Sequence, residues 1–213
     1  MTSWSDKTKV HEYVGRVGRL EARKEGEREL VEVLPQRVRH AIDLGCGDGR
    51  LISLILDARP ETTRVRGLDS SAPMLELARN RFADDERVTI EEHDLNLPVA
   101  EPEGTAGTAG ADVVVSGFAI HHLRHERKRS LFEEVFGALH PGGVFANLEI
   151  VQCATPELDA EFQRRIDRPG GDPEDILAAV EPQLEWMRDA GLVQVDCNWR
   201  WRGMALLVGQ KPA

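Results

Sequence analysis

The chain has 213 residues, 41% of them hydrophobic and 30% charged, which is the composition of an ordinary globular domain. Its 37 acidic side chains outnumber its 27 basic ones and give a formal net charge of −10, which disfavours nucleic acid as a partner. No apolar run reaches the ~18 residues that a membrane span needs. Three separated cysteines (Cys46, Cys153 and Cys197) without a CxxC pattern argue against a disulfide framework or a zinc site, so no metal is expected. The first residues lack a signal-peptide pattern, and a cytoplasmic protein is therefore expected.

Two helices are expected before residue 40. Apolar side chains recur at three- and four-residue spacing from Val10 to Leu20, and a second helix is expected over residues 22–34, where Pro35 ends it. Residues 1–40 carry nine basic and seven acidic side chains, so the acidity of the protein belongs to the remainder of the chain.

From His40 onward, apolar strands alternate with amphipathic helices. Strands are expected over a run ending at Leu44 and over residues 64–68, 88–93, 111–116 and 144–151. This alternation predicts an α/β fold with a mainly parallel sheet covered on both faces. At the C-terminus, a helix over about residues 182–191 precedes two strands, residues 192–199 and 203–209, whose short connection predicts an antiparallel hairpin at the sheet edge.

A glycine-rich turn, Asp43-Leu44-Gly45-Cys46-Gly47-Asp48-Gly49, joins the first strand to the following helix. Glycines let the backbone turn sharply and approach a ligand closely, while N–H groups of the helix point into the same crevice. The spacing is GxGxG, whereas the dinucleotide fingerprint requires GxGxxG, and position 50 is Arg50. Asp43 adds a carboxylate at the tip of the strand, where it is suited to attract an ammonium group.

With this turn the chain resembles the class I S-adenosylmethionine-dependent methyltransferases, over about residues 38–210. The resemblance implies a Rossmann-like three-layer α/β/α sandwich with a mostly parallel seven-stranded sheet, in the order 3-2-1-4-5-7-6 with strand 7 antiparallel. The antiparallel strand agrees with the hairpin inferred from the pattern alone. A narrower similarity to small bacterial methyltransferases without an assigned substrate rests on His121-His122-Leu123, Asn147-Leu148-Glu149 and residues 190–212.

The resemblance also implies one methyltransferase domain over residues 1–213. Within it, residues 1–37 are expected to form a helical lid over the cofactor, and residues 38–213 the Rossmann-like core. Residues 152–180 are expected to be an inserted segment that covers the acceptor site.

The cofactor implied by the resemblance is S-adenosyl-L-methionine, which leaves as S-adenosyl-L-homocysteine. Its contacts are expected at the glycine turn, at an acid after the second strand for the ribose, at an acid after the third strand for the adenine, and after the fourth strand for the ammonium. The expected residues at the glycine turn are Asp43, Gly45, Cys46 and Gly47, and those for the ribose are Asp69, Ser70 and Met74. Those for the adenine are Asp94 and Leu95, and those for the ammonium are Ser116 and Gly117. The cofactor carboxylate is expected to meet Tyr13 or Arg19, with Arg16 and Arg23 as alternatives. Cys46 is interpreted as a small filler and not as a nucleophile.

A catalytic base is optional in this chemistry. Methyl transfer from a sulfonium is an in-line displacement, and orientation alone supplies on the order of 7 to 11 kcal/mol. For a hydroxyl or ammonium acceptor, His121, His122 and Glu149 are the candidate catalytic residues, with His121 as the first choice, because all three are expected at strand ends facing the substrate crevice. The alternative is that one histidine hydrogen-bonds the following helix while the other is solvated.

The sequence therefore predicts a methyltransferase that acts on a small-molecule acceptor, as a monomer or homodimer. Two alternatives remain open: a tRNA or protein methyltransferase that uses the N-terminal helices and residues 199–202, and a noncatalytic module that binds S-adenosylmethionine. An NAD-dependent dehydrogenase agrees with Asp69 but not with the glycine spacing or the terminal hairpin. The acceptor atom is not identified.

Overall fold

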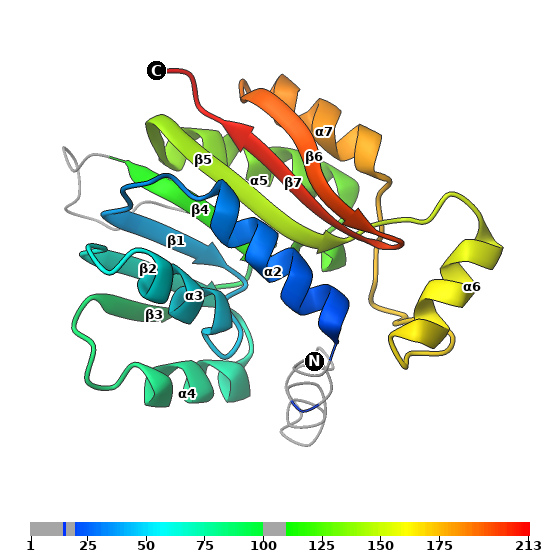
Figure 1. Cartoon of the computed structure of the whole chain (residues 1–213), viewed down its shortest axis with the longest axis horizontal. Helices are drawn as coiled ribbons and strands as arrows, with labels where there is room; N and C mark the ends of the chain where they lie inside the picture. Colours follow the sequence, from blue (N-terminus) through cyan, green and yellow to red (C-terminus); the bar gives the residue numbers. More distant parts are fainter. Residues whose placement is uncertain (1–14, 16–19, 100–109) are drawn as a thin grey trace.

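The computed structural model describes residues 15, 20–99 and 110–213 (Figure 1). Seven strands form one sheet in the order β3-β2-β1-β4-β5-β7-β6. Neighbouring strands among the first five are parallel, whereas β7 is antiparallel to both β5 and β6. The strands are β1 His40–Leu44, β2 Arg64–Asp69, β3 Val88–Glu92, β4 Ala111–Gly117, β5 Leu139–Ile150, β6 Val193–Trp201 and β7 Met204–Gln210. The predicted order and the antiparallel seventh strand are confirmed.

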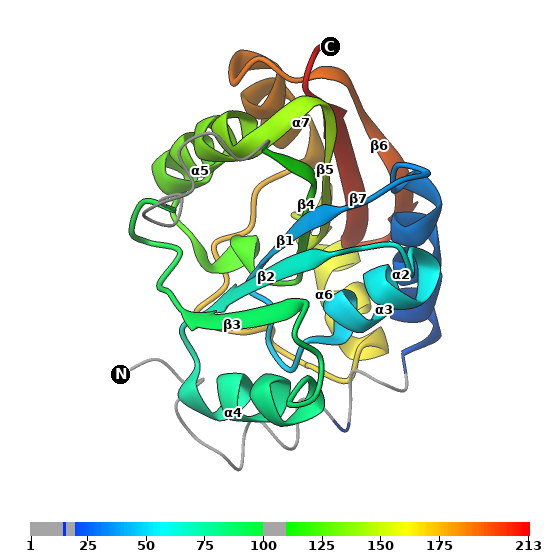
Figure 2. The same ribbon diagram turned by 90° about the vertical axis from the view of Figure 1, so that its left-hand side faces the viewer.

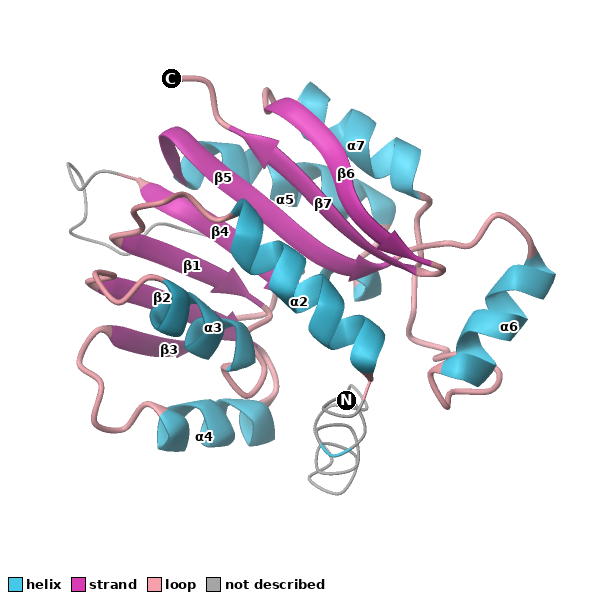
Figure 3. Ribbon diagram, in the orientation of Figure 1, coloured by secondary structure: helices cyan, strands magenta, loops and turns pink. Residues whose placement is uncertain are grey.

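Helices cover both faces of this sheet (Figure 2). α2 and α3 lie on one face, and α5 and α7 lie on the other, which gives the predicted three layers. α4 packs along β2 and β3, and α6 lies beyond the carboxyl ends of the parallel strands (Figure 3). The helices are α2 Glu21–Val33, α3 Arg50–Ala58, α4 Ala72–Arg81, the 3-10 turn η2 Ile120–His122, α5 His125–Ala138, α6 Pro156–Arg165 and α7 Val180–Asp189. Among residues 20–99 and 110–213, none of these helices has the length and apolar character of a membrane-spanning helix.

The central strands are apolar at almost every position because both of their faces are buried. On β4, Val114 packs into the core under α5 and α7, whereas Val113 and Val115 pack into the core under α2 and α3. Successive side chains of a strand point to opposite faces, so a strand covered on both sides needs an uninterrupted apolar run. This is the pattern from which the strands were predicted.

The described part of the N-terminal segment packs closely on the sheet. α2 contacts β5, β6, β7 and α3. A Cβ atom added to Gly26 would lie 2.8 Å from Leu148 Cδ1 and 2.9 Å from Trp199 Cζ3, so glycine allows the helix to lie directly on the strands. Tyr13, Arg16 and Arg19, which belong to the first predicted helix, lie outside the described residues.

The boundaries of β5, β6 and α7 differ most from the sequence prediction. β5 begins at Leu139 and not at residue 144, because Leu139 pairs with Ala111 and the following turn bonds to the C-terminus through Gly142 and Lys211. β6 extends to Trp201, because it stays paired with β7 up to the connecting turn. α7 begins at Val180, two residues before the predicted start.

Candidate active site

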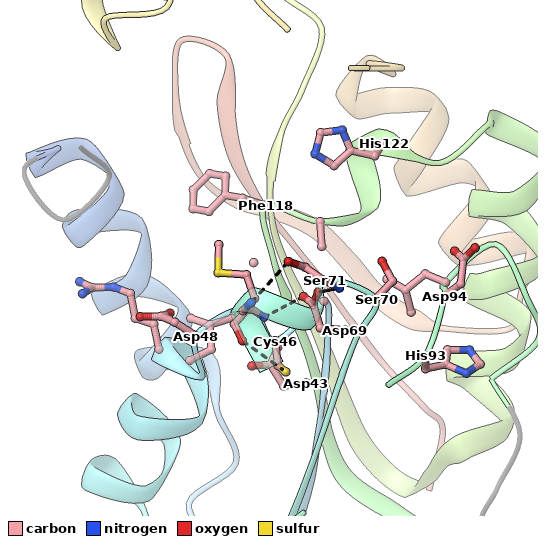
Figure 4. Close-up of a pocket in the computed structure, with 18 of the residues that line it drawn as sticks. Asp43, Cys46, Asp48, Asp69, Ser70, Ser71, His93, Asp94, Phe118 and His122 are labelled. Carbon is pink, nitrogen blue, oxygen red and sulfur yellow. Dashed lines mark hydrogen bonds between the residues drawn. The ribbon is translucent and has the colours of Figure 1, made fainter. Parts of the chain in front are cut away.

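The carboxyl ends of the central strands open into a cavity of about 470 Å³ (Figure 4). Its walls come from the segments after β1, β2, β3 and β4, and from single residues of α2 and of the segment before α7. After β1 the chain continues to β2 on one side of the sheet, whereas after β4 it continues to β5 on the other side. A topological switch point of this kind is where open α/β sheets form ligand sites.

The glycine turn forms the floor of this cavity. Gly45 has a φ of +73°, and a Cβ atom there would lie 2.1 Å from the Cβ of Ala119, so only glycine fits. Gly47 has a φ of +53°, but the nearest atom to an added Cβ is Met74 Sδ at 4.0 Å. Gly47 therefore presents bare backbone to open space within the cavity, where a ligand can approach closely.

Asp69, at the end of the neighbouring strand β2, accepts a hydrogen bond from the glycine turn. Its Oδ2 atom accepts a hydrogen bond of 2.9 Å from the Gly47 backbone N–H, and its Oδ1 atom accepts one of 2.8 Å from the Ser71 N–H. Burial raises the pKa of Asp69, and these backbone hydrogen bonds offset part of the rise. A carboxylate accepts about four hydrogen bonds, so Asp69 retains capacity for a ligand diol.

Asp43 lies at the end of β1 with a buried carboxylate. Only 1% of the residue is exposed, and neither side-chain oxygen accepts a hydrogen bond from any described residue. Burial, followed by the negative charges of Asp69 and Asp48, raises its pKa well above the ordinary range. An uncompensated buried carboxylate is unfavourable, and a cationic ligand group would relieve that cost.

The end of β3 supplies a second polar edge of the cavity. Asp94 Oδ1 accepts hydrogen bonds of 2.9 Å from both the backbone N–H and the side-chain amide of Asn96. Leu95 is almost fully buried beside them. In Figure 4, Asp94 and His93 lie on the opposite side of the glycine turn from Asp48.

Two arginines from different helices meet at the α2 side of the cavity. Arg50 forms two hydrogen bonds of 2.6 Å with the Glu27 carboxylate, and Arg23 donates a third, of 2.9 Å. Burial acts to raise the pKa of Glu27, but the hydrogen bonds from Arg50 and Arg23 outweigh it and lower the pKa. The Arg23 guanidinium also lies 4.7 Å from the centre of the Phe118 ring. Arg23, Arg50 and Phe118 all line the cavity.

The three candidate catalytic residues do not all face the cavity. His122 lines it, whereas His121 and Glu149 lie behind its wall with side chains 3% and 1% exposed. In a 3-10 turn successive side chains point about 120° apart, so the two adjacent histidines of η2 diverge. The expectation that His121 and Glu149 face the crevice is therefore corrected, and His122 takes the position expected of His121.

A buried polar cluster lies behind His122. His121 Nδ1 is 2.5 Å from Glu149 Oε1, and the rings of His121 and His122 have centroids 4.0 Å apart. Asp175, from the segment before α7, approaches both histidines. Burial, followed by the charge of His121, lowers the pKa of His122 to about 4.

Most of the predicted cofactor residues lie together in the cavity wall. Those that line it are Asp43, Gly45, Cys46, Gly47, Asp69, Ser70, Met74, Asp94, Leu95 and Gly117. Ser116 is fully buried, and its hydroxyl donates a 2.8 Å hydrogen bond to the Leu44 carbonyl, which ties β4 to β1 beneath the cavity. Burial and then the charges of Asp43 and Asp69 raise the pKa of the Cys46 thiol, in keeping with its interpretation as a filler.

Several lining residues were missed in the sequence. Arg50 is the first residue of α3, and its position directly after Gly49 was the available signal. Glu174 lies in the segment expected to cover the acceptor site, but no pattern singled it out. The other missed lining residues are Asp48, Leu51, Ser71, His93, Asn96, Ala119 and Leu123.

Comparison with known proteins agrees with this geometry. Residues 42–145 match the family model of a methyltransferase domain. An uncharacterized methyltransferase of Mycobacterium tuberculosis is 33% identical over 129 residues, which cover 61% of this chain and 58% of that protein. A trans-aconitate 2-methyltransferase of Rhizobium leguminosarum is 33% identical over 120 residues, which cover 56% of this chain and 42% of that protein. The chain thus spans less than two thirds of the length of either relative.

A solved structure extends the likeness to the whole fold. Phosphoethanolamine N-methyltransferase 2 of Haemonchus contortus, in complex with S-adenosyl-L-methionine, superposes with a TM-score of 0.73 at 16% identity, covering 100% of this chain and 61% of that one. At this identity the likeness concerns the fold alone. Together with the sheet order and the matched domain, it confirms the resemblance to the class I S-adenosylmethionine-dependent methyltransferases that the sequence showed.

Proposed function

We propose that this protein binds S-adenosyl-L-methionine in the cavity and transfers its methyl group to a small-molecule acceptor by in-line displacement. The observation that carries the proposal is the buried Asp43 carboxylate without a hydrogen bond, beside the open backbone of Gly47. A glycine-lined site with a buried carboxylate of this kind favours a ligand that carries positive charge. The bound cofactor supplies an activated methyl group on a positively charged sulfonium.

The residues present fit each part of the proposed cofactor. Asp69 retains hydrogen-bonding capacity for the ribose diol, and the Asp94–Leu95 edge offers an acceptor and an apolar wall for the adenine. Asp43 and the carbonyl groups around Gly117 suit the ammonium. Arg23 and Arg50 are the cations of the cavity wall suited to the carboxylate.

The acceptor end is assigned to His122 and Glu174. Both line the cavity, and in Figure 4 His122 lies apart from Asp69 and Asp94. Because its pKa is lowered to about 4, the His122 imidazole is neutral at pH 7 and holds a lone pair. We propose that this group, held in place by His121 and Glu149, positions the acceptor.

A small acceptor is favoured over RNA or protein by the environment of residues 199–202. Trp199 packs under α2, and Trp201 lies against Phe162 with ring centroids 6.1 Å apart. Arg202 pairs with Glu161 at 3.1 Å. These side chains thus serve packing and a surface ion pair, which leaves little of the segment for stacking on a nucleic acid.

Calorimetric titration of cofactor-free protein tests the proposal. We expect one site for S-adenosyl-L-homocysteine and for S-adenosyl-L-methionine. Gly47→Arg should abolish binding because the arginine side chain would fill the cavity beside the glycine turn. Gly137→Arg is a matched control, because Gly137 lies at an exposed helical position with no atom within 4 Å of an added Cβ. Absence of binding to the unchanged protein at high micromolar ligand would refute the proposal. Labelled methyl groups recovered on RNA or protein of a cell extract would redirect it to a macromolecular acceptor.

A further inference from the structure

Three side chains with metal-ligating atoms converge at the acceptor end of the cavity. His121 and His122 come from η2, whereas Asp175 comes from the segment between α6 and α7. His121 Nε2 lies 3.4 Å from Asp175 Oδ1, and His122 Nδ1 lies 3.5 Å from the same oxygen. One ligand atom from each of the three lies within 4.8 Å of the other two.

The hydrogen bond to Glu149 determines which atom of His121 faces this point. A carboxylate can only accept, so His121 Nδ1 donates its proton to Glu149 Oε1 at 2.5 Å. In the neutral imidazole, Nε2 then carries a lone pair directed at Asp175 Oδ1. That oxygen is buried and accepts no hydrogen bond from any described residue. Two electron-pair donors therefore face each other, and a cation between them would stabilise both.

The separations suit a tetrahedral metal ion. Zinc binds imidazole nitrogen and carboxylate oxygen at about 2.0–2.2 Å, so neighbouring ligand atoms at a tetrahedral angle lie about 3.3–3.6 Å apart. The separations of Asp175 Oδ1 from His121 Nε2 and from His122 Nδ1, 3.4 and 3.5 Å, fall in this range. The hydrogen bond from His121 to Glu149 has the form of the carboxylate–histidine–metal arrangement that orients ligands in such sites.

The neighbouring cations are already engaged by other groups. Lys128 is buried, and its ammonium donates to the backbone carbonyl groups of Ile176 and His121. Arg168 forms an ion pair with Asp172. Neither cation forms an ion pair with Glu149 or Asp175. Glu149 Oε1 accepts from the Ile150 N–H at 2.9 Å as well as from His121, and Asp175 Oδ1 faces the two histidines.

We propose that His121 Nε2, His122 Nδ1 and Asp175 Oδ1 bind one divalent first-row transition metal ion, with Glu149 orienting His121. In the metal-free protein His122 Nδ1 lies 3.4 Å from the Glu174 backbone carbonyl, so the ion would replace the proton shared in that long contact. Two imidazoles and one carboxylate are the ligands that zinc and its neighbours prefer. Three protein ligands leave a fourth position, as in catalytic zinc sites. Because His122 lines the cavity, this position faces the proposed acceptor site, and it suits an acceptor with an oxygen, nitrogen or sulfur donor. This role of the ion rests on the proposed function, whereas the binding of the ion does not.

Titration of chelator-treated protein with zinc, and with cobalt(II) as a visible probe, tests the site. We expect one equivalent to bind, with the absorption bands of tetrahedral cobalt. Asp175→Asn and His121→Ala remove ligands and should weaken binding by at least about 10- to 100-fold, and Glu149→Gln should weaken it within that range by loosening His121. His140→Ala is the matched control, because His140 is an exposed histidine outside the cluster, and it should change nothing.

Two results would overturn the inference. One is no binding at 100-fold excess zinc; the other is binding of equal affinity in the unchanged protein and in Asp175→Asn. Either result would leave a protonated His121 bridging two carboxylates as the explanation of the cluster. Titration of each metal-free variant with S-adenosyl-L-homocysteine verifies that it is folded. It also separates the two proposals, because retained cofactor binding without metal binding would refute only the metal site.

Discussion

The two ends of the cavity are built in different ways. At the cofactor end, Asp43, the glycine turn and Asp69 come from two adjacent parallel strands and the turns that follow them. At the acceptor end, His121 meets Glu149 from β5, and His122 meets Asp175 from a segment without regular secondary structure. The first end depends on a local strand–turn–helix pattern, whereas the second depends on where three distant segments meet. The difference indicates that cofactor binding and acceptor binding can be changed separately.

Replacement of Asp43 should have the largest effect. Asp43→Asn removes the buried negative charge, and we expect the affinity for S-adenosyl-L-homocysteine to fall by about 30-fold or more, as when one partner of a buried charge pair is lost. The folded protein should become more stable, because the raised pKa of Asp43 means that its ionised form disfavours folding. A rise in melting temperature of about 2–4 °C corresponds to each 1 kcal/mol gained.

Calorimetry and thermal unfolding measure these two effects of Asp43→Asn. Asp57→Asn, at an exposed position of α3, is the control and should alter neither. Weaker binding together with lower stability would contradict the interpretation, because it would mean that the carboxylate supports the fold and not the ligand.

Replacement of Glu27 tests whether the ion pairs of Glu27 with Arg23 and Arg50 anchor α2 at the cofactor end of the cavity. Glu27→Gln leaves Arg23 and Arg50 facing each other without the carboxylate between them. We expect a loss of about 2 kcal/mol in the free energy of unfolding, measured by urea denaturation. Glu25→Gln on the exposed face of the same helix should cost less than about 0.5 kcal/mol. Equal effects of the two changes would show that α2 is not anchored through this network.

The cofactor end could largely be predicted because its signals are close together in the sequence. The glycine spacing, Asp43 and Asp69 each follow an apolar strand, and the carboxyl ends of adjacent parallel strands necessarily meet. The sheet order was implied by the family resemblance, whereas the antiparallel hairpin was predicted from the pattern of the chain itself, because the hairpin breaks the strand–helix alternation. Arg50 was missed because a residue between a turn and a helix has no distinctive pattern of its own.

The acceptor end could be predicted only in part. His121, His122 and Glu149 were identified as candidates, but no pattern in the sequence decides which of the two adjacent histidines faces the cavity. The 3-10 turn decides it, and that turn is set by tertiary contacts such as the hydrogen bond from the Ile176 N–H to the His121 carbonyl. Asp175 belongs to a segment without periodicity, so nothing in the sequence linked it to the histidines.

The pH dependence of cofactor binding should show a moderate effect. The ammonium of the cofactor is expected to bind the ionised form of Asp43, whose pKa is raised in the free protein. Affinity should therefore fall several-fold as the pH drops through that raised pKa, and Asp43→Asn should remove this dependence.

The stability of the free protein should change with pH in the opposite sense. Its native state binds the Asp43 proton more tightly than its unfolded state does, so the native state loses stability as the pH rises through the same range. Calorimetry at a series of pH values, with unfolding curves beside it, measures both. A pH profile unchanged in Asp43→Asn would assign the dependence to another group.

Replacement of His122 should have the smallest effect on cofactor binding. His122 lines the same cavity as Asp43 and Asp69. If the cofactor end and the acceptor end formed one binding site, removal of the imidazole would lower the affinity for S-adenosyl-L-homocysteine. We expect His122→Gln to leave this affinity within about threefold of the unchanged protein, a difference below about 0.7 kcal/mol, because the imidazole lies at the acceptor end and its polar neighbours are Glu174 and Asp175. His93→Gln, at the opposite edge of the cavity, is the matched comparison and should have the larger effect if adenine lies there. A loss of tenfold or more in His122→Gln would mean that the two ends form one binding unit, and that the histidines contribute to holding the cofactor.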